Sequence, residues 1–172
     1  PQKLVGRDKE IWAMLKSFRQ VCKGNKEIIM VSGYPGIGKT SLVLEVHKLI
    51  VKMRSYFISG KYDQHRRDLP YSSILKAFTE LMEQILVESD KKIQQWKEAI
   101  LQEVGNSGRV ITDFIPMVKY IIGEQPEVPK LGPEETENRF NLFFKKFIKV
   151  FARKEHPLVI FIDNLQWADK AS

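Results

Sequence analysis

Hydrophobic and polar residues follow two distinct patterns along this 172-residue chain. Where apolar residues return every three or four positions they line one face of a helix, so this spacing predicts helices. Short runs of consecutive apolar residues between turn residues predict strands that are buried on both faces. The helical spacing covers residues 7–22, 39–53, 71–88, 91–104, 108–122 (interrupted at Pro116) and 134–153, and the apolar runs cover 27–32, 56–59 and 158–162.

The order of these elements predicts an α/β domain. Strands that alternate with helices typically form a parallel sheet flanked by helices. The sequence between the second and third predicted strands is all helical, so we expect a large helical insertion over 60–156 within a single domain of residues 1–172. Three strands make a thin sheet and Pro1 is not an initiator methionine. We therefore expect a truncated domain whose later strands and lid lie beyond Ser172.

Composition excludes several classes of protein. The chain is 43% hydrophobic and 28% charged, as in ordinary globular domains. Its longest apolar run, 158–162, is far shorter than the ~18 residues of a membrane span, and no signal peptide is visible. A single cysteine excludes an intramolecular disulfide, and the three scattered histidines do not form a metal motif. These features predict a cytoplasmic protein that does not contact a membrane.

The net charge of +7 is confined to the first half of the chain. Residues 1–86 contain 15 basic and 8 acidic side chains, whereas residues 87–172 contain 13 of each. A basic domain can bind nucleic acid, but a site that handles phosphate groups also favours a positive field. Charge alone leaves both interpretations open.

Residues 33–40 (Gly-Tyr-Pro-Gly-Ile-Gly-Lys-Thr) match the phosphate-loop pattern G-x-x-x-x-G-K-[ST], between a predicted strand and a predicted helix. Glycines let backbone N–H groups surround phosphate oxygens, and the helix N-terminus adds partial positive charge. Lys39 is expected to reach the β- and γ-phosphates, and the Thr40 hydroxyl to ligate Mg²⁺. The predicted nucleotide-binding residues in this region are Gly33, Tyr34, Pro35, Gly36, Ile37, Gly38, Lys39, Thr40 and Ser41.

Asp163 follows the apolar run at 158–162 directly. A carboxylate at the carboxyl end of a strand next to a phosphate loop can hold Mg²⁺ directly or through water. The pattern is weak alone but specific downstream of a complete phosphate loop. Thr40 and Asp163 are therefore the predicted metal ligands, and ATP with Mg²⁺ is the predicted cofactor.

Further motifs support a family resemblance. Residues 4–10 (Leu-Val-Gly-Arg-Asp-Lys-Glu) and 161–169 (Phe-Ile-Asp-Asn-Leu-Gln-Trp-Ala-Asp) resemble the AAA-related ATPase domain of the STAND class of signalling P-loop NTPases. Residues 57–64, 70–71 and 137–141 resemble the version found in large bacterial multi-sensor proteins. There the module sits between a Ser/Thr protein-kinase-like domain and a GAF sensor region with a histidine kinase. The resemblance covers essentially the whole chain.

This resemblance implies additional site residues. Val5, Gly6 and Arg7 would lie near the adenine, and Asp163 on Mg²⁺. Many relatives carry a second acidic residue directly after the strand Asp, where this chain has Asn164. An amide can orient the attacking water but cannot accept its proton, so slow or regulated hydrolysis is expected. A general base must therefore come from elsewhere, and Asp169 is a candidate, its alternative role being a helix N-cap or a surface carboxylate. The candidate catalytic residues are Asp163, Asn164 and Asp169.

Two basic features allow more than one interpretation. The run at 65–67 (His-Arg-Arg) suggests a nucleic-acid contact or an arginine finger, although a solvated loop is the simpler interpretation. Arg139 follows several acidic residues and is expected either to pair with Glu135 or to project toward the nucleotide.

The sequence therefore predicts a Mg-ATP-binding regulatory module of a multidomain bacterial signal-transduction kinase in a two-component system. Its expected partners are the nucleotide and the flanking kinase and sensor domains of the same polypeptide, with nucleotide-dependent self-association as a further expectation. One alternative is a DNA-associated AAA ATPase of the replication-initiator kind, which the charge of +7 favours but which lacks a helix-turn-helix pattern. The other is a small-molecule P-loop kinase that uses the helical insertion as a substrate lid.

Overall fold

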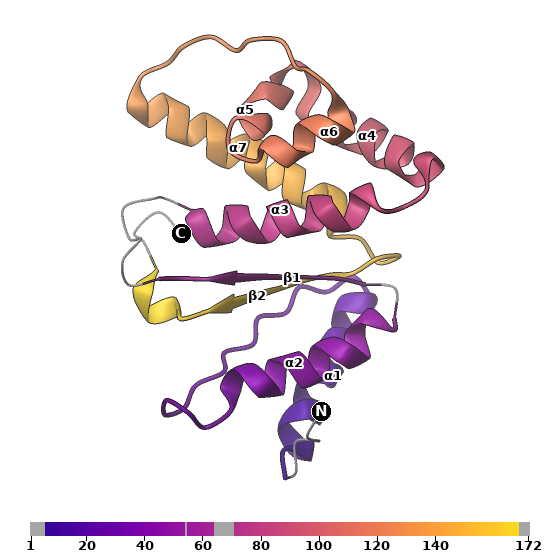
Figure 1. The fold of residues 1–172 in the computed structure, drawn as a ribbon, viewed down its shortest axis with the longest axis vertical. Helices are drawn as coiled ribbons and strands as arrows, with labels where there is room; N and C mark the ends of the chain where they lie inside the picture. Colours follow the sequence, from indigo (N-terminus) through magenta and orange to yellow (C-terminus); the bar gives the residue numbers. More distant parts are fainter. Residues whose placement is uncertain (1–5, 54, 64–70, 169–172) are drawn as a thin grey trace.

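The computed structural model describes residues 6–53, 55–63 and 71–168. A small sheet lies between two helical layers (Figure 1). Helices α1 (Asp8–Cys22) and α2 (Lys39–Val51) cover one face of the sheet. Helix α3 (Ser72–Leu86) covers the other face, and the remaining helices pack beyond α3.

The sheet consists of β1 (Tyr56–Lys61) and β2 (Leu158–Asp163), which pair in parallel. Tyr56 lies opposite Leu158 at the start of the pair, and Lys61 lies opposite Asp163 at its end. Two of the predicted strands and their parallel arrangement are therefore confirmed. Asp163 is the last residue of β2, as expected, so its carboxylate stands at the carboxyl edge of the sheet.

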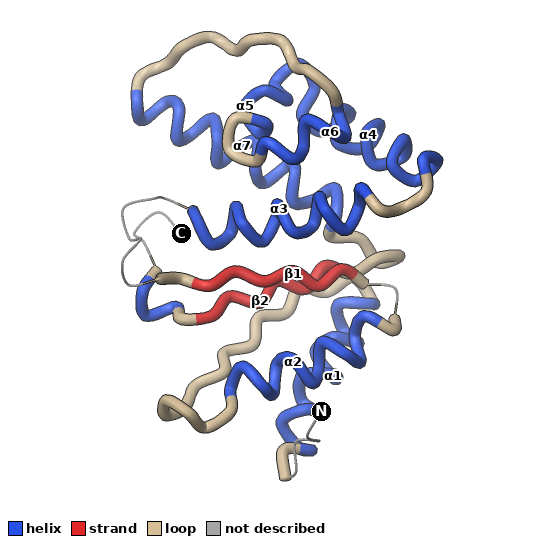
Figure 2. The backbone as a smooth tube through the Cα atoms, in the orientation of Figure 1, coloured by secondary structure: helices blue, strands red, loops and turns tan. Residues whose placement is uncertain are grey.

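The predicted strand at 27–32 is wrong for the structure as described. These residues have no regular secondary structure and connect α1 to the phosphate loop as an open segment (Figure 2). Ile28 is 90% exposed and Met30 is 75% exposed. A strand is stabilised by hydrogen bonds to a neighbouring strand, and the described residues supply no strand that pairs with this segment. The apolar composition of 27–32 predicts burial but cannot show whether a neighbouring strand is present to pair with it.

The chain between β1 and β2 contains α3 and the helices packed on it. These are α4 (Asp90–Val104), α5 (Gly108–Thr112), α6 (Lys119–Ile122) and α7 (Pro133–Phe151), with short 3₁₀ turns at Gly105–Ser107 and Pro116–Val118. The helical stretch predicted over 108–122 with an interruption at Pro116 forms α5, a turn that starts at Pro116, and α6, so the interruption is confirmed. Pro116 begins that turn because proline has no N–H for a helical hydrogen bond.

The main hydrophobic core lies in this helical layer. Ile58 of β1 is fully buried against it, together with aromatic side chains from α3 and α7. Phe147 of α7 packs near Phe78 of α3 and Phe151 of its own helix, with ring centroids 5.8 and 5.0 Å away. A smaller core joins α1 and α2 through Phe18, Val46 and Ile50, with Val159 of β2 packed against it. Three residues of β1 are buried, whereas β2 is only partly buried and Ile160 is 39% exposed, so the expected burial of both faces is not met for β2.

Polar side chains of α3 close the outer edge of β1. Gln84 donates through Nε2 to the Phe57 carbonyl (3.0 Å), and the Glu80 carboxylate accepts from the Ser59 N–H (3.0 Å). The Ser73 hydroxyl donates to the Lys61 carbonyl at 2.9 Å. These bonds satisfy backbone groups that a further strand would otherwise use. The sheet therefore ends at β1 on this side. On the other side, no strand among the described residues pairs with the outer edge of β2.

None of the helices among the described residues is sufficiently long and apolar to cross a membrane.

Candidate functional site

The phosphate loop depends on glycine for its backbone conformation. Gly36 and Gly38 have φ angles of +80° and +90°, in the left-handed region that L side chains rarely adopt. A Cβ added at either position would meet no atom within 4 Å, so conformation and not space demands glycine here. Gly38 is also the N-cap of α2, and its carbonyl accepts the Leu42 N–H at 3.0 Å. The loop therefore leads directly into the positive end of a helix.

The Lys39 ammonium bends back over this loop. Its Nζ donates to the carbonyl oxygens of Gly33 (2.8 Å) and Tyr34 (3.0 Å). Tyr34 itself is 84% exposed and contributes its backbone here. Phosphate oxygens carry negative charge and are stronger partners for an ammonium than neutral carbonyls are. Lys39 is thus placed beside the backbone groups of the loop, where a phosphate could take over its hydrogen bonds.

Thr40 and Asp163 lie side by side although 123 residues separate them in the chain. The Thr40 hydroxyl donates to Oδ2 of Asp163 at 3.2 Å. This contact joins the first turn of α2 to the carboxyl end of β2. Hydroxyl and carboxylate oxygens are the hard ligands that Mg²⁺ uses, typically together with waters and substrate phosphates. The two residues therefore fit a nucleotide-bound Mg²⁺.

Protein side chains alone do not form a complete metal site among the described residues. The described ranges contain no group of three or more His, Cys, Asp or Glu side chains that could hold an ion. A magnesium ion at this place would need phosphate oxygens to complete its coordination, since Thr40 and Asp163 supply only part of it.

The turn after β2 places Asn164 next to the same carboxylate. The Asn164 backbone N–H donates to Oδ1 of Asp163 at 2.9 Å. The side-chain amide of Asn164 donates through Nδ2 to the carbonyl of Tyr62 at 3.3 Å. Tyr62 follows β1, so Asn164 joins the carboxyl ends of both strands. Sequence reasoning did not identify Tyr62, because a backbone carbonyl leaves no signal in residue types.

Arg7 connects α1 to the phosphate loop. Its Nη2 donates to the Ile37 carbonyl at 3.3 Å, while Nη1 forms an ion pair with Glu10 at 2.9 Å. The hydrogen bond from Arg7 lowers the pKa of the Glu10 carboxyl below its ordinary value. Gly6, which precedes Arg7, has a φ of +83°. Arg7, which the family resemblance places near the adenine, is therefore adjacent to the phosphate loop.

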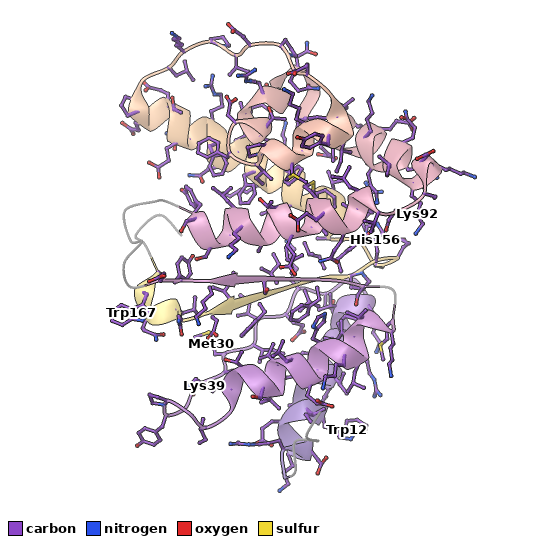
Figure 3. All side chains as sticks on the ribbon, viewed as in Figure 1. Trp12, Met30, Lys39, Lys92, His156 and Trp167 are labelled. Carbon is purple, nitrogen blue, oxygen red and sulfur yellow. The ribbon has the colours of Figure 1, made fainter. Side chains whose placement is uncertain are left out.

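A cleft of about 320 Å³ opens between α1, the segment before the loop and the start of α2. Figure 3 labels Lys39 and Met30, both of which belong to its wall. The lining combines apolar side chains with a few charged ones, as small-molecule sites commonly do. The lining residues are Arg7, Glu10, Ala13, Met14, Ile29, Met30, Val31, Ser32, Ile37, Gly38, Lys39 and Leu42.

Other predicted residues have different outcomes. Arg139 meets neither of its expectations within the described part of the chain: its Nη1 donates to the Pro129 carbonyl at 2.7 Å, ten residues earlier. Arg139 therefore fastens the connector before α7 to that helix. Val5, Asp169 and the basic run at 65–67 lie outside the described residues. Pro35 and Ser41 are exposed, in the loop and in the first turn of α2 respectively.

A glycine-rich loop at the start of a helix, joined to an acidic strand end of a parallel sheet, defines a P-loop nucleotide-binding domain. A family model described as "AAA ATPase domain" matches residues 3–172. The chain therefore belongs to the AAA ATPase domain family.

Two curated proteins are similar to the chain. "Hybrid signal transduction histidine kinase G" of Dictyostelium discoideum is 41% identical over 170 residues, which cover 98% of this chain and 5% of that protein. "Histidine protein kinase 1" of Candida albicans (strain SC5314 / ATCC MYA-2876) is 22% identical over 164 residues, covering 87% of this chain and 7% of that protein. No solved structure matches.

The chain thus spans only a small fraction of each of these multidomain kinases. They support the expectation of a module within a signal-transduction kinase. Neither organism is a bacterium, so these two relatives do not support the specific resemblance to bacterial multi-sensor proteins.

Proposed function

We propose that this chain is a Mg-ATP-binding regulatory module of a multidomain signal-transduction kinase. The observation that carries the proposal is the contact between Thr40, directly behind the phosphate loop over which Lys39 bends, and Asp163 at the carboxyl end of β2. Membership of the AAA ATPase domain family and the similarity to two histidine kinases support it.

In this proposal the nucleotide phosphates bind over the start of α2. Backbone N–H groups of residues 33–38 surround the phosphate oxygens, and Lys39 exchanges the carbonyls of Gly33 and Tyr34 for the β- and γ-phosphates. Thr40 and Asp163 would hold Mg²⁺, which neutralises phosphate charge when bound. The Thr40–Asp163 hydrogen bond supports this assignment, because it holds the two proposed ligands next to each other.

The adenine would occupy the cleft beside the loop. Met14 and Ile29 supply apolar contacts, and the Arg7 bond to the Ile37 carbonyl keeps α1 against the loop. Val5 and Gly6 would complete this wall, as the family resemblance implies. In this proposal the base lies on the α1 side and the phosphates lie at the N-terminus of α2.

The output of the module would be a conformational change and not rapid turnover. A switch requires different affinities for a nucleotide in two conformations. Asn164 has no group that accepts a proton from water, so hydrolysis in this proposal is slow or depends on Asp169.

The remaining proposals are a single P-loop domain over 1–172 with a helical insertion at 60–156, a STAND-type switch between flanking kinase and sensor domains, nucleotide-dependent self-association, and a cytoplasmic location.

Calorimetric titration of the chain with Mg-ATP, Mg-ADP and Mg-GTP tests this function. We expect saturable 1:1 binding of both adenine nucleotides and weaker binding of GTP, because the apolar side chains of Met14 and Ile29 would desolvate the more polar edge of guanine. The ratio of the ATP and ADP affinities then reports which nucleotide the described conformation prefers. If no nucleotide binds at millimolar concentration, the proposal is rejected.

Removing either proposed magnesium ligand should reduce the gain in ATP affinity that Mg²⁺ provides. The affinity for ATP without Mg²⁺ should change less. For Thr40→Ala and Asp163→Asn we expect the ratio of ATP affinity in Mg²⁺ to that in EDTA to fall by about tenfold, the loss of roughly one charge-assisted contact. Lys48→Ala, at an exposed position further along α2, is the control and should keep the wild-type ratio. An unchanged ratio in both variants would place Mg²⁺ elsewhere.

A further inference from the structure

Asn164 adopts a backbone conformation that few residues tolerate. Its φ and ψ angles are 59° and 42°, in the left-handed helical region. Among the described non-glycine residues only Tyr71 shares a positive φ. Asparagine enters this region at lower cost than other L residues. The residue type at position 164 therefore matches the turn that follows β2.

This turn directs a backbone donor onto the site carboxylate. The Asn164 N–H points back to Oδ1 of Asp163, whereas Oδ2 of the same carboxylate accepts from Thr40. Both oxygens of Asp163 are thus held by different partners, one on each side. The rotation of the carboxylate, and so the oxygen that faces Thr40, depends on the conformation of Asn164.

The side-chain amide of Asn164 fixes the turn from the other side. A carbonyl oxygen accepts hydrogen bonds and cannot donate them, so the amide must present its NH₂ group to Tyr62. The Tyr62 N–H in turn donates to the Asp163 carbonyl at 3.1 Å. These two bonds form a closed ring between the ends of β1 and β2. The amide NH₂ is therefore engaged with the sheet.

We propose that Asn164 is a positioning residue, which orients the Asp163 carboxylate toward Thr40, and not a weakened substitute for a catalytic acid. The proposal deepens the function proposed above and rests on it for its nucleotide readout. An aspartate at position 164 would set a carboxylate oxygen against the Tyr62 carbonyl and a second negative charge beside Asp163. In this chain, restoring an acid would therefore damage the site.

Two substitutions separate the side chain from the backbone of the turn. Asn164→Gly keeps the left-handed conformation and the N–H to Asp163 but removes the bond to Tyr62. Asn164→Asp keeps the shape and replaces the donor by an acceptor. We expect the Mg²⁺/EDTA ratio of ATP affinities to fall by about tenfold in Asn164→Asp and about threefold in Asn164→Gly, with affinity in EDTA near that of the wild type.

The control is Gln166→Ala, an exposed position two residues further along the same turn, which should keep the wild-type ratio. A reduced ratio without faster ATP turnover in Asn164→Asp supports the inference. An unchanged ratio, or faster ATP hydrolysis in Asn164→Asp, overturns it, since the position would then behave as that of a missing base.

Hydrogen exchange distinguishes this inference from the proposed function. In the absence of nucleotide, the backbone amides of Tyr62 and residue 164 should exchange at least about fivefold faster in Asn164→Asp than in the wild type. Both amides donate to Asp163, and loss of the bond from residue 164 to Tyr62 loosens the turn that holds them there. If the wild type binds no nucleotide, the proposed function fails. Faster exchange would then still support the positioning of Asp163 by Asn164, and unchanged exchange would overturn it.

Discussion

Replacing Lys39 by alanine is expected to reduce the affinity for Mg-ATP by at least about 100-fold. The ammonium lies over the phosphate loop, held by the Gly33 and Tyr34 carbonyls. Two charge-assisted hydrogen bonds to phosphate, each worth about 1.5 kcal/mol or more, correspond to that factor. Calorimetric titration of the variant measures it directly. The effect should be larger for ATP than for ADP, because the γ-phosphate adds a partner for the ammonium.

Lys48→Ala is the matched control for this prediction. Lys48 belongs to the same helix, is exposed, and pairs with Glu45 at 2.8 Å. A surface ion pair of this kind contributes little, so we expect the Mg-ATP affinity to stay within about twofold of the wild type. Equal losses in the two variants would show that general positive charge, and not the phosphate loop, attracts the nucleotide.

Replacing Phe147 by alanine is expected to lower the free energy of unfolding by about 3–5 kcal/mol. The ring is fully buried at the centre of the helical layer, where it packs against Phe78 and Phe151. Truncation leaves a cavity that the surrounding aromatic side chains cannot fill. Urea unfolding followed by far-UV circular dichroism gives the change. Because a whole domain is stable by only about 5–15 kcal/mol, this one change removes a large part of the total.

Phe143→Ala serves as the comparison within α7. That ring is only partly buried and has the Lys146 ammonium 5.2 Å from its centroid. We expect a loss of about 1 kcal/mol, mainly from reduced apolar burial and the exposed cation–π contact. Should Phe147→Ala prevent folding, Phe147→Leu leaves a smaller cavity and should cost about 1–2 kcal/mol. Similar losses of unfolding free energy in Phe147→Leu and Phe143→Ala would be compatible with this account. A smaller loss in Phe147→Ala than in Phe143→Ala would contradict it.

Local sequence predicted the elements whose causes are local. Helix α7 begins at Pro133, which suits the first helical position, and carries Glu134 and Glu135 near its positive end. Its repeated phenylalanines specify the face that packs into the core. Helix α2 follows directly from the glycine pattern of the loop. In each case neighbouring residues in the chain supply the cap, the turn or the apolar face.

The strand predicted at 27–32 and the role of Arg139 show where this reasoning stops. An apolar run predicts burial, but only a neighbouring strand makes it a strand, and Ile28 and Met30 are exposed. Acidic neighbours suggest an ion pair for Arg139, yet the bent connector brings the Pro129 carbonyl to its guanidinium instead. Both outcomes depend on how distant segments pack.

The sequence by itself determined the chemical groups of this protein: a phosphate loop, an acidic strand end, and a chain that alternates between strands and helices. Only the tertiary structure decided which of these groups meet. Thr40 reaches Asp163 across 123 residues, and Asn164 reaches the Tyr62 carbonyl across 102. Hydrogen bonds of this kind depend on the parallel register of β1 and β2 and on the packing of α2 against the sheet. No local pattern specifies that geometry, because it results from burying the helical faces and the strands together.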